Sequence, residues 1–121
     1  MPLKFTICSM DLGLKEKVII VTGGSKGIGG GIVSLLAKEG ALPVIIGRNK
    51  ESILNVVADY HKRGVEIGYA FAELTQPDEC EQAIKAILEK FGRIDGLVNN
   101  AGVNDGIGLE NGTYEDFMES I

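Results

Sequence analysis

Three glycines at fixed spacing form the part of this sequence with the clearest chemical use. The motif Gly23-x-x-x-Gly27-x-Gly29 follows the β-branched run Val18–Val21 and precedes a helical pattern. Residues without a Cβ permit a tight turn and close backbone approach, and N–H groups at the positive end of a helix can hold a pyrophosphate. The chain does not contain the related spacing Gly-x-Gly-x-x-Gly. Because glycines also serve strand–helix turns that bind nothing, the motif alone leaves ligand binding open.

A second motif, Asn99-Asn100-Ala101-Gly102, follows the predicted strand 94–98. Together the two motifs resemble the short-chain dehydrogenase/reductase family, and the resemblance covers residues 12–121. It implies a nicotinamide dinucleotide cofactor and hydride transfer to or from an alcohol or sugar carbinol. The resemblance assigns to the pyrophosphate and the adjacent ribose Gly23, Ser25, Gly27, Ile28 and Gly29, and to the adenine ribose Asn99, Ala101 and Gly102.

The end of the third predicted strand would contact the adenine. The family commonly has Asp and an apolar residue there to bind the adenine amine, and this chain has Glu73 and Leu74. The resemblance therefore gives these two residues the adenine contact.

The choice between NADP and NAD depends on the end of the second predicted strand. A carboxylate there bonds the ribose 2′-hydroxyl of NAD, whereas an Arg accommodates the 2′-phosphate of NADP. This chain has Arg48 between Gly47 and Asn49, with no acid, and Lys26 in the glycine motif supplies a second cation. These residues favour NADP, with NAD as the alternative. Arg48 could instead stack on the adenine while Lys26 is solvated.

The catalytic residues of the family do not occur in this sequence. The family has a Ser followed by Tyr-x-x-x-Lys, but none of Tyr60, Tyr69 and Tyr114 has a Lys four residues later. We assign no catalytic residue and expect these 121 residues alone to show no dehydrogenase activity. The alternative interpretation is a non-catalytic nucleotide-binding remnant or a fragment of a truncated gene.

The stretch 91–109 is similar to sugar dehydrogenases of the same family, in particular the bacterial L-fucose dehydrogenase type. Asn104 and Asp105 follow the fourth predicted strand, where parallel sheets bind ligands, and could bond sugar hydroxyls. Asn-Asp-Gly is also a good turn sequence, so a purely structural role stays open for both residues.

The apolar pattern alternates between strand and helix, which predicts an α/β fold. Strands are expected at 18–21, 44–46, 67–71 and 94–98, with a helix after each of the first three, a loop at 103–112 and a last helix from Thr113. Right-handed crossovers then give a partial Rossmann-like, doubly wound parallel sheet of strand order 3-2-1-4.

Helix ends and buried faces follow from the same pattern. We expect Asn49 to cap the second helix, Thr75 with Asp78 to open the third, and Gly92 to end it. The expected buried faces are Ile28, Ile32, Leu35 and Leu36 in the first helix, Ile53, Val56, Val57 and Tyr60 in the second, and Cys80, Ala83, Ile84, Ile87, Leu88 and Phe91 in the third.

Length, charge and composition bear on the number of domains and on the kinds of partner and site that the chain can have. With 121 residues and a net charge of −5, the chain offers one domain, 10–121, and no basic patch for nucleic acid. Residues 1–9 are expected to be a disordered extension. No apolar run is long enough to span a membrane, and Cys8 and Cys80 suggest neither a disulfide framework nor a metal site. We therefore expect a cytoplasmic protein, and the family resemblance implies a homo-oligomer for the complete enzyme.

Overall fold

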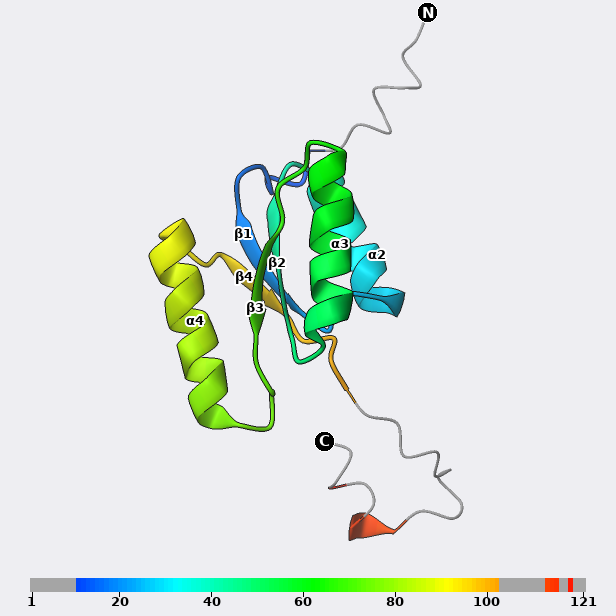
Figure 1. Cartoon of the computed structure of the whole chain (residues 1–121), viewed down its shortest axis with the longest axis vertical. Coiled ribbons are helices and arrows are strands. Elements are labelled where there is room, and N and C mark those ends of the chain that lie inside the picture. Colours follow the sequence, from blue (N-terminus) through cyan, green and yellow to red (C-terminus); the bar gives the residue numbers. More distant parts are fainter. Residues whose placement is uncertain (1–10, 103–112, 116–117, 119–121) are drawn as a thin grey trace, which may run out of the picture.

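The computed structural model describes residues 11–102, 113–115 and 118. Strands and helices alternate along the described chain (Figure 1), which confirms the predicted order. The strands are β1 (Val18–Thr22), β2 (Leu42–Gly47), β3 (Gly68–Phe71) and β4 (Gly96–Val98), and the helices are α2 (Gly27–Lys38), α3 (Lys50–Lys62) and α4 (Pro77–Phe91).

The four strands form one parallel sheet in the order β3-β2-β1-β4. This order confirms the predicted 3-2-1-4 arrangement and the partial Rossmann-like fold. All five residues of β1 are buried, because β1 lies between β2 and β4 and the sheet has helices on both faces. The carboxyl ends of β1, β2 and β4 lie at one edge of the sheet, where the sequence motifs follow them.

Helices cover both faces of the sheet, with α2 and α3 on one side and α4 on the other (Figure 1). Alternate strand residues contribute to two separate apolar clusters, as expected for side chains of period two. The buried residues of the cluster under α4 are Val18, Ile20, Val44, Ile46, Ala72, Ala83 and Ile87, and those of the cluster under α2 and α3 are Val21, Val33, Ile45, Ile53 and Ile67.

The predicted buried face of α2 was partly wrong. Ile28 is 80% exposed and Leu35 is 64% exposed, whereas Gly29 and Val33 are buried. The reason is steric: Gly29 lies so close to the turn before the helix that a Cβ there would overlap the Gly23 carbonyl oxygen. This approach fixes the rotation of α2, so that the line from Gly29 to Val33 faces the sheet.

The capping prediction is confirmed for α3 and wrong for α4. The Asn49 side chain accepts a hydrogen bond of 3.0 Å from the Ser52 N–H, as expected for an N-cap. The N-cap of α4 is Gln76, which makes no side-chain capping bond, and Pro77 follows it in the first turn.

The rest of α4 agrees with the sequence pattern except at Leu88. Ala83 and Ile87 are buried, and Ile84 and Phe91 pack against the same cluster. Leu88 is 44% exposed. Gly92 ends the helix with φ of 78°, a left-handed conformation that favours glycine.

β4 begins at Gly96, two residues later than predicted. The residue before it makes the connection to β1: the Asp95 N–H donates to the Val18 carbonyl oxygen at 2.8 Å, and the Val18 N–H donates to Asp95 Oδ2 at 2.8 Å. Arg93 holds the same carboxylate through Nε at 2.8 Å and Nη2 at 2.7 Å. Asp95 therefore anchors the start of β4 to the start of β1.

Several predictions concern residues outside the described part of the chain. These are the extension at 1–9, the loop at 103–112 with Asn104 and Asp105, and most of the last helix. Within that helix, Tyr114, Glu115 and Met118 are helical and exposed.

Candidate functional site

The glycine motif forms the turn between β1 and α2. Gly23 and Gly27 have φ of 67° and 62°, which other residues rarely adopt. The Gly23 N–H donates to the Ile46 carbonyl oxygen at 2.9 Å, so the turn is attached to the end of β2. A Cβ at Gly29 would overlap the Gly23 carbonyl oxygen. The backbone conformation thus favours glycine at Gly23 and Gly27, and close packing requires it at Gly29.

The amino end of α2 is open toward solvent. Its N-cap, Lys26, makes no side-chain capping bond, and the first turn contains no acidic residue. A Cβ at Gly27 would meet no atom within 4 Å. The first N–H groups of a helix have no partner within the helix and carry the positive end of its dipole. The space and the charge therefore suit a phosphate group, and the residues present fit a dinucleotide pyrophosphate.

The second motif is attached directly to the first through Thr22, the last residue of β1. The buried Thr22 hydroxyl accepts hydrogen bonds from the N–H groups of Asn100 at 3.0 Å and Ala101 at 3.1 Å, and it donates to the Val98 carbonyl oxygen at 3.3 Å. Asn100 Nδ2 also donates to the Gly23 carbonyl oxygen at 3.2 Å. One hydroxyl and one amide thus join the ends of β1 and β4.

Sequence reasoning missed the roles of Thr22 and Asn100. The sequence does contain a signal for both residues. A polar residue, Thr22, ends an otherwise apolar strand, and two adjacent asparagines directly follow another. The structure brings the remaining predicted residues of this motif, Asn99, Ala101 and Gly102, to the same sheet edge as the glycine turn, and all three are exposed.

Arg48 and Glu73 lie at the carboxyl ends of the adjacent strands β2 and β3, as predicted. The structure also pairs them: Arg48 Nη1 donates to Glu73 Oε2 at 3.2 Å. This hydrogen bond is the main reason that the pKa of Glu73 lies below its usual value, with smaller lowering effects from Thr75. The sequence assigned the two side chains to separate parts of a cofactor, and their pairing was not foreseen.

The other predicted site residues surround the glycine turn or follow β3. Lys26 and Ile28 are exposed at the start of α2, and Ser25 is half-buried. Leu74 is 38% exposed next to Glu73. The exposure of Ile28, which contradicts its predicted place in the core, leaves its side chain available beside the turn.

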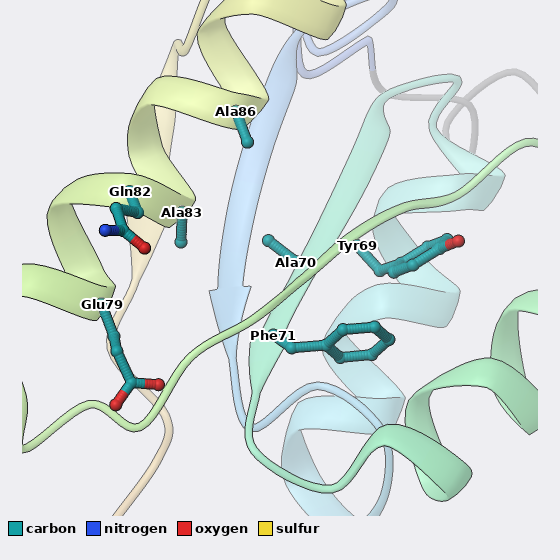
Figure 2. Close-up of a pocket in the computed structure, with 7 residues that line it drawn as sticks. All are labelled: Tyr69, Ala70, Phe71, Glu79, Gln82, Ala83 and Ala86. Carbon is teal, nitrogen blue, oxygen red and sulfur yellow. The ribbon is translucent and has the colours of Figure 1, made fainter.

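A separate hollow of about 310 Å³ lies between β3 and α4 (Figure 2). Ala70 points toward Ala83 and Ala86 of α4, whereas Tyr69 and Phe71 lie on the other side of β3 (Figure 2). β3 is separated from β1 by β2. The hollow is therefore distinct from the edge where the two motifs meet.

In the part of the chain that the structure describes, no helix is both long and apolar enough to cross a membrane. No group of three or more His, Cys, Asp or Glu side chains in these residues could hold a metal ion.

Comparisons with known proteins agree with this geometry. Sorbitol-6-phosphate 2-dehydrogenase of Klebsiella pneumoniae is 42% identical over 93 residues, which are 77% of this chain and 32% of that protein. A 3-oxoacyl-(acyl-carrier-protein) reductase of Chlamydia pneumoniae is 39% identical over 94 residues, which are 78% of this chain and 38% of that protein.

A solved structure shows the same arrangement. L-Sorbose reductase from Gluconobacter frateurii, in complex with NADPH and L-sorbose, superposes with a TM-score of 0.77 and 30% identity. The superposition covers 89% of this chain and 41% of that one.

The chain thus spans 32% and 38% of the length of the two curated relatives. The short chain dehydrogenase family matches residues 17–121, which include both motifs and all the described strands. With the glycine turn, the 3-2-1-4 sheet and this match in agreement, the chain belongs to the short chain dehydrogenase family.

Proposed function

We propose that this chain forms the cofactor-binding part of an NADP-preferring oxidoreductase that acts on an alcohol or sugar carbinol. The observation that carries the proposal is the glycine turn with the open start of α2, directly joined to the Asn99–Gly102 motif. The NADPH in the structurally similar L-sorbose reductase supports the choice of cofactor. NAD stays the alternative.

The chain's own residues would bind and orient the dinucleotide. The N–H groups at the start of α2 would hold the pyrophosphate, and Gly27 would leave room for it. Arg48 and Lys26 would bind the 2′-phosphate, Arg48 as a planar fork and Lys26 as a point charge. Asn99 and Ala101 would lie beside the adenine ribose. A bound NADP supplies or accepts the hydride, and this chain determines where the dinucleotide lies.

The proposed substrate is a sugar or polyol. Two of the similar proteins, named for sorbitol 6-phosphate and L-sorbose, support this proposal, while others are named for a 3-oxoacyl and a steroid substrate. The resemblance to L-fucose dehydrogenases stays a prediction, as do the roles of Asn104 and Asp105. We also propose a cytoplasmic homo-oligomer that does not bind nucleic acid, in keeping with the net charge of −5.

Direct binding of NADPH tests the proposed function. NADPH fluorescence or calorimetry would give the dissociation constant for wild-type protein and for Gly27→Asp and Gly27→Asn. Both side chains occupy open space, and both residues tolerate positive φ better than most. Only Asp adds a negative charge where the pyrophosphate would lie. We expect Asp to weaken binding at least about 10-fold more than Asn.

Gly31→Ala is the control, because position 31 lies in α2 outside the turn and a Cβ there meets no atom within 4 Å. It should leave NADPH affinity unchanged. Failure of the wild-type protein to bind either dinucleotide, or equal affinity in the Asp and Asn variants, would overturn the proposed function.

The cofactor preference has its own test in Arg48→Asp. Loss of a charge-assisted contact to the 2′-phosphate should weaken NADPH binding by about 1 to 3 kcal/mol and change NADH binding much less. An unchanged ratio of the two affinities would show that Arg48 does not select the cofactor.

A further inference from the structure

The ion pair between Arg48 and Glu73 places a negative charge beside the cation proposed to bind the 2′-phosphate. Arg48 Nη1 lies 3.2 Å from Glu73 Oε2, and the pair bridges the ends of β2 and β3. A carboxylate after β2 would oppose the 2′-phosphate directly. Here the carboxylate is that of Glu73, which follows the next strand, β3. It lies in the same region because it pairs with Arg48. The inference drawn from this pair rests on the proposed function.

The two partners differ in how firmly they are held. The Arg48 side chain is 79% exposed, and that of Glu73 is 33% exposed. Thr75 helps to lower the pKa of the Glu73 carboxyl group, after the larger effect of Arg48. The Glu73 N–H donates to Glu79 Oε1 at 3.1 Å, and its carbonyl oxygen accepts from the Gln76 N–H at 2.9 Å. Glu73 is thus fixed in the turn before α4, and Arg48 is the partner that can reorient.

The pair is weak enough to exchange. An exposed ion pair contributes little and is screened by salt. A phosphate carries more charge than a carboxylate and can also take both arms of a guanidinium. Arg48 could therefore turn from Glu73 to a 2′-phosphate. Its movement would break the ion pair with Glu73, whereas a 2′-hydroxyl would leave the ion pair intact.

We propose that Glu73 is a positioning residue for cofactor selection: its carboxylate competes with the 2′-phosphate for Arg48 and so limits the preference for NADP over NAD. Lys26 and Lys50 supply further positive charge at this edge, the latter with Nζ 5.4 Å from the centre of the Phe71 ring. The preference for NADP over NAD therefore depends on the balance between these positive charges and the negative charge of Glu73.

This role differs in a measurable way from the adenine contact that the family resemblance implies for Glu73. The adenine is common to both cofactors, so loss of an adenine contact would change NADPH and NADH binding equally. Loss of a competitor for Arg48 would change NADPH binding alone. The ratio of the two affinities therefore separates the roles.

The test measures dissociation constants of NADPH and NADH for wild-type protein, Glu73→Gln, Arg48→Gln and the double variant. Glu73→Gln keeps the shape of the side chain and removes its charge. We expect NADPH to bind about 3- to 10-fold more tightly to Glu73→Gln, with NADH changed less than about 2-fold. In the Arg48→Gln background, the same change at position 73 should alter the ratio less than about 2-fold.

A matched control is Asp59→Asn, which removes one carboxylate from the exposed Asp59–Arg63 pair of α3. It changes the net charge by the same amount as Glu73→Gln and should leave the ratio of the NADPH and NADH affinities unaltered. The effect of Glu73→Gln should also shrink as salt rises, which a purely structural role would not produce.

Two outcomes would overturn the inference while leaving the proposed function intact. One is an unchanged ratio of the NADPH and NADH affinities in Glu73→Gln, whether neither affinity changes or both change equally. The other is a ratio change that persists without Arg48. A wild-type protein that binds neither cofactor would instead refute the proposed function itself.

Discussion

The substitution Gly29→Ala should destabilise the protein because it adds a methyl group where the structure has no room. The new Cβ would overlap the Gly23 carbonyl oxygen and lie 2.5 Å from Asn100 Nδ2. Neither neighbour can move freely, since Gly23 is fixed to Ile46 and Asn100 is bonded to Gly23. The methyl group must therefore displace α2 or break the hydrogen bond between Asn100 and Gly23.

Two effects destabilise the variant and one opposes them. Overpacking costs about 1 to 3 kcal/mol, and loss of the Asn100–Gly23 hydrogen bond adds about 0.5 to 1.5 kcal/mol where that bond breaks. Alanine offsets at most about 1 kcal/mol through its better helix propensity. If the hydrogen bond breaks, we expect Gly29→Ala to lower the free energy of unfolding by about 0.5 to 4.5 kcal/mol.

Gly31→Ala makes the same chemical change two residues later in the same helix, where a Cβ meets no atom within 4 Å. It should raise the free energy of unfolding by up to about 1 kcal/mol. Urea unfolding followed by far-ultraviolet circular dichroism would measure both variants. Equal changes in the free energy of unfolding of the two variants would refute the steric argument. A Gly29→Ala protein at least as stable as the wild type would also refute it.

Three other substitutions test the contacts around the site. Thr22→Val should cost about 1 kcal/mol in thermal unfolding, because it leaves two partly buried N–H groups without their acceptor, while Thr22→Ser should retain most of the stability. Asn49→Ala should cost about 1 kcal/mol through loss of the α3 cap, and Asn49→Asp should not; equal losses would exclude capping as the cause. Asp95 has its pKa lowered by Arg93 and by the Val18 N–H, so its contribution is present above its usual pKa and lost as the pH falls through the lowered one. Asp95→Asn should therefore weaken the acid dependence of unfolding in that range, and an unchanged pH profile would contradict this.

The sequence predicted the sheet because apolar strand patterns alternate with helical periodicity. The helix positions and the cap at Asn49 follow from periodicity and local residue preference, and the strand order follows from right-handed crossovers. The buried face of α2 did not, because it depends on one close contact: Gly29 against Gly23 turns Ile28 and Leu35 outward. Periodicity identifies which residues are apolar, and it carries no information about a backbone approach.

The same limit applies to the candidate site. The glycine turn and the Asn99–Gly102 motif were found from residue type and position. The pairing of Arg48 with Glu73 was not, because the two residues follow different strands and the sequence does not show which way their side chains point. The hydrogen bonds of Thr22 were missed for a similar reason, since a threonine at the end of a strand has many possible partners.

The Thr22 hydroxyl also determines when the site can appear during folding. It bonds the N–H of Asn100 across 78 positions of sequence, whereas β1 and β2 are joined through the much nearer helix α2. Long loops close more slowly than short ones and at a higher entropic cost. The β1–α2–β2 unit can thus assemble with its glycine turn already formed. The Asn99–Gly102 motif joins this turn only after β4 pairs with β1. The amide protons of Asn100 and Ala101 would therefore report the completion of the site, because their protection from exchange requires the most distant strand pairing in the sheet.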